Sequence, residues 1–416
     1  MPARILRSPL QVSRAVAEPA RPARADDPQR RAAGRAAQSA QTREPAMDST
    51  LGERLSARHQ DAPLRIAHLL GSGGFYGLER MLLEHCQYAP GQHRVILLGG
   101  PESLAQRFRE AGVELTRCGG LGSLLRQLGQ SDARPALLNG HGFKGLVYGW
   151  LGALLLGLPL VATQHGFTPR SRKQRFYAWL SLQLCRTAQV RTVVCVATSI
   201  ACLHRQAGVR AGKLQVLPNG LPPAPAVTYL RPPGAPAAPL IGFVGRLSAE
   251  KGPDLFVELA IELCCRDPRL HAVLLGEGPL RDELQEIIDA AGLHERILLP
   301  GYRTDLPAWL RALDALVISS RSEGTPMVLL EAMQAGVPVA AFAVGGIPDV
   351  LDHEASGLLS PPGEVGDLTR QVARLLFDKP LGRALSERAR LAQQRHHHLP
   401  AQAERWRQLY RNAAGG

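Results

Sequence analysis

One segment of the chain reads Leu316-Val317-Ile318-Ser319-Ser320-Arg321-Ser322-Glu323-Gly324-Thr325-Pro326-Met327-Val328-Leu329-Leu330-Glu331-Ala332-Met333-Gln334-Ala335-Gly336-Val337-Pro338-Val339. The apolar run at its start predicts a buried strand. Pro326 is typical of the first turn of a helix, where its fixed φ and missing N–H cost nothing. Gly336 is typical of a helix end, and another apolar run follows it. The segment therefore predicts strand, helix, strand.

The same alternation continues in both directions, from Leu64 to Gly220 and again from Leu240. Pro and Ala dominate the residues between these two parts, which is typical of a semi-rigid connector. We therefore predict an α/β chain with two doubly wound, Rossmann-like domains that face each other across a cleft. The predicted parts are a disordered tail (1–60), an N-terminal Rossmann-like domain (61–220), a linker (221–239), a C-terminal Rossmann-like domain (240–395) and a C-terminal helix that packs back toward the first domain (396–416).

The formal net charge of the chain is +13, and part of it lies in the predicted tail. Residues 1–60 hold eleven Arg against six acids and no apolar signal core, so we expect disorder there, with Met47 as an alternative start. The remaining basic charge is compatible with anionic nucleotides, an anionic membrane or nucleic acid. An aromatic content of 5% disfavours a base-stacking platform, so we expect no nucleic-acid partner.

Two further patterns concern the location of the protein. The seven cysteines form no Cys-x-x-Cys pair, which favours reduced thiols and a cytoplasmic protein. The longest apolar stretch, residues 146–162, is divided by Gly157-Leu158-Pro159, so we predict a core helix followed by a strand rather than a membrane span.

Glu323 and Glu331 flank the predicted start of the helix, where the amides of Met327 and Val328 are free to bind an anion. A carboxylate accepts hydrogen bonds from hydroxyls, so this arrangement fits a sugar nucleotide. Glu323 would bind the sugar, Glu331 the ribose, and the helix terminus the diphosphate. The spacing alone is equally compatible with a solvated loop acid and a helix-surface acid.

Two cations follow the strand at 241–244, in the turn Gly245-Arg246-Leu247-Ser248-Ala249-Glu250-Lys251-Gly252. Arg246 can bind phosphate through a bidentate fork and Lys251 as a point charge, so together they could stabilise a departing diphosphate. The alternative is a surface pair of cations beside Glu250. Gly245 would let the backbone approach the donor.

Two later strand ends carry glycine turns, which let a ligand approach the backbone. Gly276 and Glu277 would form a wall of the nucleotide pocket, and Gly301 with Tyr302 would contact the base. In the first domain, the Gly-x-Gly-x-x-x-Gly spacing of residues 71–77 and the lack of an acid after the next strand disfavour a nicotinamide enzyme. A loop containing Gly73 and Gly74 and lying over phosphate or acceptor fits better. Each of these glycine patterns is also compatible with an ordinary tight turn that binds nothing.

His141 and His165 fall at two predicted strand ends of the first domain, which places them toward the crevice. A structural role is the alternative for both, and neither has a ligand partner at metal-binding spacing. His396, His397 and His398 are interpreted as a solvated turn. No Asp-x-Asp element holds a divalent ion on a diphosphate, so we expect a reaction without metal or cofactor.

Arg170, Arg172, Lys173 and Arg175 precede the apolar residues 176–180. A basic segment with an apolar face is typical of contact with an anionic membrane or a lipid-linked acceptor. A solvated helix with one buried side is the alternative. Contact with lipid would place the protein at the inner face of the cell membrane.

Taken together, these motifs resemble glycosyltransferase family 4, which has the GT-B fold. The resemblance is carried by Gly245-Arg246 with Lys251-Gly252, Gly276 to Leu280, Pro300-Gly301 and Glu323 to Met333, and more loosely by Gly73-Gly74, His141, Thr163 with His165, and Pro218-Asn219-Gly220. It covers residues 64–415, and the basic tail lies outside it.

The resemblance implies a retaining, metal-independent transferase that moves a hexose-type sugar from a UDP- or GDP-sugar to a glycan, lipid-linked or small-molecule hydroxyl. It implies that the N-terminal domain (61–220) binds the acceptor and that the C-terminal domain (240–395) binds the nucleotide sugar. Polysaccharide biosynthesis is the implied process. His141 would lie beside the transferred sugar, and His165 on the acceptor side. This sequence has Pro326 where many relatives have glycine, so one amide contact to the sugar is lost. An epimerase or hydrolase on the same fold, and a non-catalytic sugar-nucleotide or membrane-binding scaffold, are the alternatives.

Overall fold

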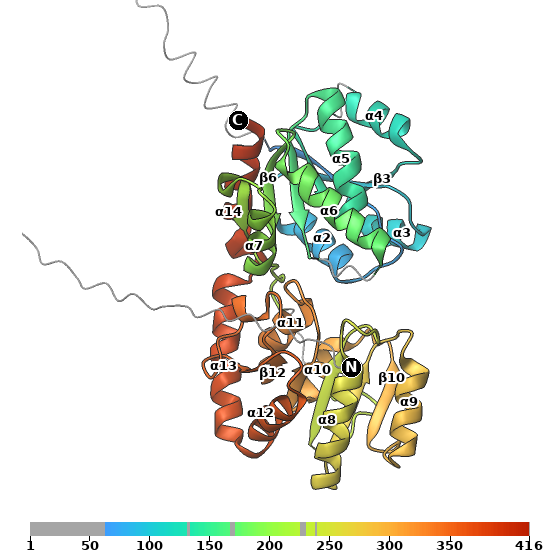
Figure 1. Cartoon of the computed structure of the whole chain (residues 1–416), viewed down its shortest axis with the longest axis vertical. Coiled ribbons are helices and arrows are strands. Elements are labelled where there is room, and N and C mark those ends of the chain that lie inside the picture. Colours follow the sequence, from blue (N-terminus) through green and yellow to red (C-terminus); the bar gives the residue numbers. More distant parts are fainter. Residues whose placement is uncertain (1–62, 131–133, 167–170, 225–229, 238, 416) are drawn as a thin grey trace, which may run out of the picture. The chain divides into compact units, whose positions relative to one another are not determined.

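Strands and helices alternate through the described chain, as the apolar runs predict. The computed structural model describes residues 63–415 except 131–133, 167–170, 225–229 and 238, and these residues belong to one compact unit, Ala62–Gly416. The predicted tail lies outside the described residues. Both predicted parallel sheets are present, each with helices on its two faces (Figure 1).

The first sheet has seven parallel strands in the order β3-β2-β1-β4-β5-β6-β7. Its strands are β1 (Arg65–Leu70), β2 (Gln92–Leu97), β3 (Glu114–Arg117), β4 (Leu137–His141), β5 (Leu160–Gln164), β6 (Val190–Cys195) and β7 (Leu214–Val216). The helices of this part are α2 (Gly77–Tyr88), α3 (Glu102–Glu110), α4 (Leu121–Gly129), α5 (Gly142–Leu156), α6 (Arg172–Arg186) and α7 (Thr198–Gln206).

Successive side chains of β1 point alternately to the two faces of the first sheet. Ala67 and Leu69 pack into the same cluster as Leu146 of α5. Ile66 packs instead with Tyr410 near the C-terminus, and Leu70 with Leu82 of α2. His68 has the parity of Ile66 and Leu70, so it lies on the face that α2 and the C-terminal helix cover.

The second sheet has six parallel strands in the order β10-β9-β8-β11-β12-β13. Its strands are β8 (Leu240–Val244), β9 (His271–Leu275), β10 (Ile297–Gly301), β11 (Ala315–Ile318), β12 (Val339–Phe342) and β13 (Leu358–Ser360). The helices that follow or flank them are α8 (Pro253–Arg266), α9 (Arg281–Ala290), α10 (Leu306–Ala312), α11 (Met327–Ala335), α12 (Val365–Phe377) and α13 (Lys379–His396).

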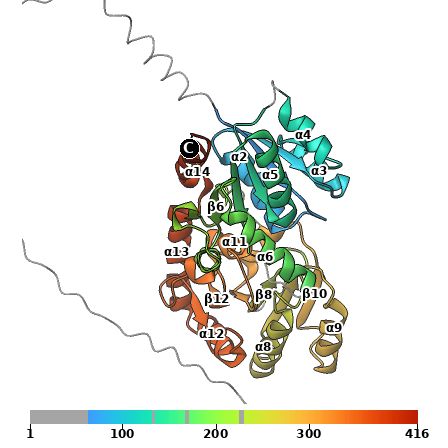
Figure 2. The ribbon, with the colours of Figure 1, turned by 45° about the horizontal axis from the view of Figure 1, so that its top comes forward.

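The last helix, α14 (Leu399–Gly415), packs on the first sheet, where it contacts β4 and α2. Its residues Trp406, Leu409 and Tyr410 join a buried cluster with Ile66 and Leu137, and Figure 2 shows α14 beside α2. The chain therefore returns to the first sheet after it completes the second. His397, at the start of this return, is buried, and its Nδ1 lies 3.2 Å from the Asn219 carbonyl oxygen. The prediction of a solvated turn is therefore wrong for His397, although His396 is exposed.

The long apolar stretch forms α5 and β5, which confirms the core helix and following strand. Gly157 ends α5 with a φ of 65°, and Leu160 begins β5. Across the described residues, we find no helix with both the length and the apolar character needed to cross a membrane. All seven cysteines are described, and each of them is a free thiol.

Candidate functional site

The junction between β11 and α11 has nearly the predicted form. Gly336 ends α11 in the left-handed conformation, as predicted, with a φ of 73°. The helix begins one residue later than predicted, because Pro326 is extended (φ −70°, ψ 125°) and Met327 is the first helical residue. No side chain caps this N-terminus. The amides of Met327 and Val328 are therefore not bonded by a capping side chain, and the helix dipole favours an anion beside them.

Glu323 lies just before this helix and is held by two groups. Its Oε1 and Oε2 lie 2.7 and 2.8 Å from Nζ of Lys251, and the Ser320 hydroxyl donates to Oε1 at 2.6 Å. The Glu323 side chain is 7% exposed, whereas that of Lys251 is 32% exposed. The structure thus brings together two residues that the sequence assigned to different parts of a donor. A carboxylate retains further lone pairs after accepting these bonds, so Glu323 can still accept from a hydroxyl.

Glu331, in the second turn of α11, forms an ion pair with Arg80 of α2. Arg80 also donates to Glu84 at 3.0 Å. The sequence analysis did not identify Arg80, because the two partners are 251 residues apart and no local spacing connects them. The arginine neutralises a carboxylate whose side chain is only 12% exposed. Glu331 is therefore an oriented acceptor rather than a solvated helix acid.

The loops after the second-sheet strands pack on one another through glycines. A Cβ on Gly276 would lie 1.9 Å from the Gly245 carbonyl oxygen, and one on Gly301 would lie 2.5 Å from a carboxylate oxygen of Glu277. At Gly276 the two backbones are therefore too close for any side chain, whereas at Gly301 the close atom belongs to a movable side chain and the φ of 78° is what favours glycine. The glycines bring the predicted donor-binding loops together.

Three other predicted donor residues are open to solvent. Arg246 is exposed, and its guanidinium has no ion-pair partner within the described part of the chain. Tyr302 is exposed, and Glu277 is an exposed acid whose Oε1 lies 3.7 Å from Nη1 of Arg281. These side chains are free to move toward a ligand.

The glycine loop that follows β1 is held by hydrogen bonds between its own residues. The Ser72 hydroxyl donates to the Gly74 carbonyl at 2.9 Å, and Gly73 is exposed. The Tyr76 amide donates to Glu79 at 2.8 Å, which closes the start of α2. Met327 contacts this region, because it packs against the buried cluster of Leu70 and α2.

His141 and His165 lie at the carboxyl ends of β4 and β5, and they face each other. Nδ1 of His141 is 3.3 Å from Nε2 of His165, and Nε2 of His141 is 3.0 Å from Nδ1 of His68. Burial lowers the pKa of His141 well below its usual value and that of His165 to about 4. Both rings are therefore neutral near pH 7. His141 makes both of its ring contacts to other histidines, and His68 is the partner that the sequence analysis missed.

Hydrogen bonds join the loop of Glu323 to the carboxyl ends of the first sheet. The Thr325 hydroxyl donates to the Val196 carbonyl, and Asn219 donates to the Thr325 carbonyl at 3.0 Å. The Thr198 amide donates to Asp349 at 2.6 Å. The predicted donor residues of the second sheet thus lie next to the strand ends that carry the histidines.

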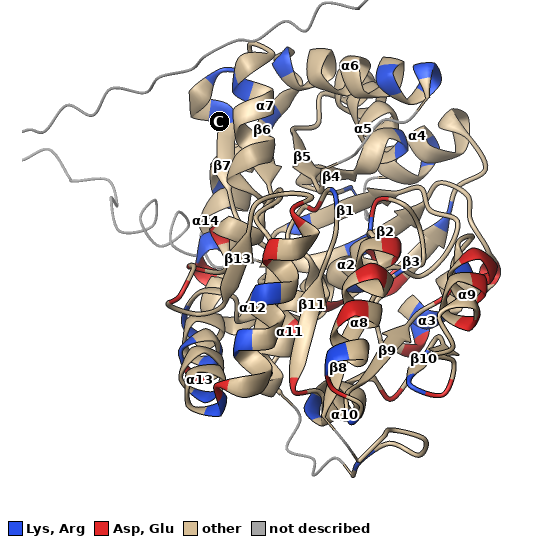
Figure 3. Cartoon of the chain, turned by 60° about the horizontal axis from the view of Figure 1, so that its bottom comes forward, with Lys and Arg blue, Asp and Glu red and all other residues tan. Residues whose placement is uncertain are grey.

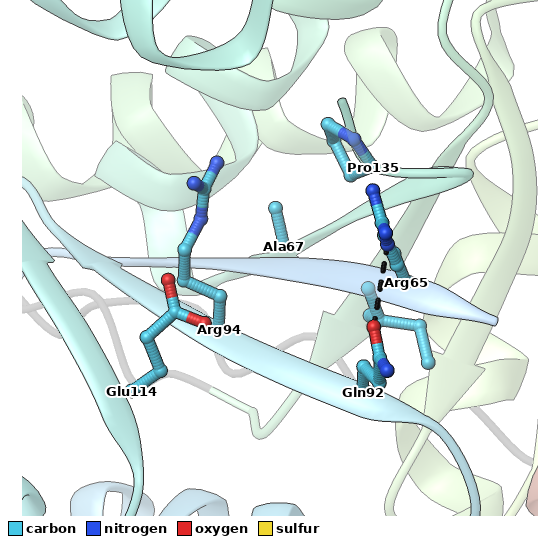
Figure 4. Close-up of a pocket in the computed structure, with 7 residues that line it drawn as sticks. Arg65, Ala67, Gln92, Arg94, Glu114 and Pro135 are labelled. Atoms are coloured by element: carbon cyan, nitrogen blue, oxygen red, sulfur yellow. Dashed lines mark hydrogen bonds between the residues drawn. The ribbon is translucent and has the colours of Figure 1, made fainter. Parts of the chain in front are cut away.

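Two surface hollows lie outside this constellation. Figure 4 shows the first, at the amino ends of β1, β2 and β3, where Arg65 donates to Gln92 at 3.3 Å. The second lies at the carboxyl ends of β2 and β3 and is lined by Leu98, Gly99, Arg117, Cys118, Gly119, Gly120, Lys144 and Tyr148. The predicted site residues lie at the carboxyl ends of the strands, so the first hollow lies at the opposite edge of the sheet from them, whereas the second lies at the same edge.

Two family models match the chain. The model described as glycosyl transferases group 1 matches residues 233–392, and that described as Glycosyltransferase Family 4 matches residues 75–224. The 2-deoxystreptamine glucosyltransferase of Streptomyces kanamyceticus is 32% identical over 274 residues, which are 61% of this chain and 70% of that protein.

Two further similarities agree with these matches. The UDP-Gal:alpha-D-GlcNAc-diphosphoundecaprenol alpha-1,3-galactosyltransferase of Escherichia coli is 28% identical over 273 residues, 59% of this chain and 67% of that protein. Anabaena HepE, solved with UDP-glucose, superposes with a TM-score of 0.72 at 21% identity, over 83% of this chain and 99% of HepE. The similarity to HepE shows a shared fold.

Proposed function

The chain belongs to glycosyltransferase family 4 and has the GT-B fold, and we propose that it transfers a hexose from a UDP- or GDP-sugar to an acceptor hydroxyl. We propose that the transfer retains the anomeric configuration of the sugar and needs no divalent ion on the donor. The product would be an α-glycoside. A UDP-sugar is the first donor to test, because the name of the similar galactosyltransferase includes UDP-Gal and HepE was solved in complex with UDP-glucose.

The observation that carries this proposal is the Lys251–Glu323 pair in front of the uncapped terminus of α11. In transfer, the diphosphate gains charge as the glycosidic bond breaks, so prepositioned cations and dipoles lower the barrier. Lys251, Arg246 and the amides of Met327 and Val328 supply that stabilisation. Glu323 orients Lys251 and accepts from sugar hydroxyls.

Glu331 and Arg80 have a different role in the proposed complex. The carboxylate of Glu331 accepts from ribose hydroxyls, and its ion pair with Arg80 holds it in orientation. Because Arg80 comes from α2, donor binding would depend on both sheets. His165 supplies a neutral ring on the acceptor side, and His141, whose two ring nitrogens face His68 and His165, lies beside the transferred sugar.

The acceptor is proposed to be a glycan or a lipid-linked sugar. Helix α6 carries basic residues and no acid along its length, as Figure 3 shows, and its aromatic residues Phe176 and Trp179 are 54% and 53% exposed. These rings lie beside each other, with centroids 5.8 Å apart. We infer a peripheral contact with an anionic membrane surface, on the cytoplasmic side of the cell membrane.

The test is a donor screen that detects released nucleotide, with EDTA present and with candidate acceptors added one at a time, followed by NMR of the new linkage. An α product from an α donor in EDTA supports the proposal. Metal-dependent transfer or a β product would overturn the mechanism. Release of free sugar without any acceptor would indicate a hydrolase instead.

A further inference from the structure

Three histidines meet on the face of the first sheet that α2 and α14 cover, and the proposed transfer does not use them as a group. They are His68 on β1, His85 on α2 and His93 on β2. One ring nitrogen of each lies within 4.8 Å of a ring nitrogen of the other two. His68 and His85 are buried and His93 is half-buried, so the group can be reached from one side.

The register of the sheet explains why they meet. His68 pairs with Val95 across β1 and β2, and His93 has the same parity as Val95, so both rings emerge on one face. His85 belongs to the buried side of α2, together with Met81 and Leu82. The contact is therefore fixed by two strands and one helix, all rigid elements.

The three rings form a nearly regular triangle. The centroids are 5.5 Å apart for His68 and His85, 5.2 Å for His68 and His93, and 5.3 Å for His85 and His93. Three imidazoles on one tetrahedral ion, with metal–nitrogen bonds of about 2.0 to 2.1 Å, have ring centres about 5 Å apart. Small rotations of these rings would direct three lone pairs at one point.

The outer ring atoms also have the contacts that metal-binding histidines make. Nε2 of His93 lies 3.1 Å from the Ala89 carbonyl oxygen, and Nε2 of His85 lies 2.8 Å from the Tyr410 hydroxyl. A ligating histidine commonly donates its second N–H to a carbonyl or similar acceptor, which fixes the ring orientation. Burial lowers the pKa of all three histidines, so the rings are neutral and their lone pairs are available near pH 7.

We propose that His68, His85 and His93 bind one divalent ion of the zinc class, with a solvent oxygen as the fourth ligand. The group contains no carboxylate, so it does not suit magnesium, calcium or manganese, whereas imidazole suits zinc, copper and nickel. The ion would tie β1, β2 and α2 together. It is separate from the donor groups Lys251 and Glu323, and the proposal does not rest on the transfer reaction.

Binding requires the ring protons to shift along a chain of histidines that runs from His68 to His141 and His165. Ala89 O can only accept, so His93 carries its proton on Nε2, and its Nδ1 accepts from Nε2–H of His68 at 2.9 Å when no metal is bound. With metal on Nε2 of His68, its proton moves to Nδ1 and is donated to Nε2 of His141. The proton of His141 moves in turn from Nε2 to Nδ1, which faces Nε2 of His165, and His165 changes tautomer in the same sense. No net proton is lost.

The experiment uses the full chain without a polyhistidine tag, stripped with chelator and then titrated with Zn²⁺ against a chromophoric chelator. One ion per chain is expected. His85→Gln should weaken binding by at least about 10-fold, because a ligand is removed. The matched control is His204→Gln, which changes a buried histidine whose ring, among the residues that the structure describes, bonds only the Ile200 carbonyl of its own helix.

In a second variant, the exposed His396 and the half-buried His398 near the C-terminus are both replaced by Ala, which tests whether these histidines bind the ion instead. Zinc affinity unchanged in this variant and in His204→Gln, but lost in His85→Gln, supports the site. Zinc lost in the His396 and His398 variant, or retained in His85→Gln, overturns it.

Cobalt keeps the proposal testable if His85→Gln fails to fold. The stripped wild-type chain should give the intense visible absorption of tetrahedral Co²⁺ at one equivalent, and Zn²⁺ should abolish it. The absence of that absorption, or an octahedral spectrum, contradicts the proposal.

Discussion

The two sheets have the same doubly wound topology, but their carboxyl ends carry different chemistry. The first sheet carries the buried residues Asn139, His141 and Thr163 toward this end. The Thr163 hydroxyl donates to Asn139, and His141 faces His165, so these contacts are between neutral groups. The second ends in a charged pair, Lys251 and Glu323, beside an uncapped helix. Topology fixes where a ligand meets each sheet, whereas the loops decide which part of the ligand is bound. The charged end suits a diphosphate, and the neutral end suits sugar hydroxyls.

The largest effect is expected from Lys251→Ala, which tests the charged end. The variant removes a cation from the proposed leaving group and leaves Glu323 buried without its partner, so kcat should fall by about 10²-fold or more. The measurement is nucleotide release at saturating donor. Lys379→Ala is the control, because Lys379 pairs with Asp314 on the surface, with Nζ 2.7 Å from Oδ1. If Lys251→Ala keeps the wild-type kcat, the charged carboxyl end of the second sheet does not stabilise the leaving diphosphate, and the proposed chemical difference between the two sheet ends is wrong.

A smaller effect is expected from Glu331→Ala, which tests whether donor binding depends on both sheets. Loss of a charged acceptor for ribose hydroxyls should raise the donor KM by about 10-fold, since such hydrogen bonds contribute about 1.5 to 3 kcal/mol. Arg80→Ala should change KM in the same direction, because it leaves Glu331 without its arginine.

The control for both variants is Glu387→Ala, which removes an exposed acid paired with Arg390 on α13. An unchanged KM in Glu331→Ala, with the fold intact by circular dichroism, would exclude the ribose role. A changed KM in Glu331→Ala but not in Arg80→Ala would limit donor binding to the second sheet.

The neutral end should make stability depend on pH. Burial lowers the pKa of His165 from 6.5 to about 4, so between these values the unfolded chain binds more protons than the folded one. The contribution of His165 to the free energy of unfolding is therefore fully present above pH 6.5 and is lost as the pH falls toward 4. The slope from this residue is at most about 1.4 kcal/mol per pH unit. Urea unfolding at pH 7, 6 and 5, in chelator, measures it.

His165→Gln should make that pH dependence shallower, whereas His294→Gln, at an exposed position, should not alter it. An unchanged slope in His165→Gln would show that His165 is readily protonated in the folded chain. The inference that the carboxyl end of the first sheet is uncharged would then be wrong for His165.

Much of the second sheet could be predicted from local sequence. The apolar run at Leu316, the helix end at Gly336 and the positions of Lys251 and Glu323 all follow from patterns within a few residues. Their mutual contact did not follow, because it joins loops after two different strands. The start of α11 was misplaced by one residue, since proline suits both the residue before a helix and its first turn.

The first sheet was harder to predict because its polar residues act across strands and helices. His68 sits within the apolar run Arg65 to Leu70, and a histidine at a core parity of a buried strand is a signal that could have been used. His85 and Arg80 could not be linked to their partners without the packing of α2. The cluster of His68, His85 and His93 depends on register, which the sequence pattern alone leaves open.

The smallest effect is expected at α6, where exposed apolar and basic groups lie together outside both sheet ends. Replacing Phe176 and Trp179 by Ser should lower binding to anionic vesicles by roughly 5-fold, because the rings bury only part of their area at an interface while the basic residues still attract the surface. Vesicle sedimentation measures the change. Leu203→Ser, at another exposed apolar position, is the control and should bind as the wild type does. Equal binding to anionic and zwitterionic vesicles, or an unchanged double variant, would leave α6 as a solvated helix and confine recognition of the acceptor to the neutral strand ends.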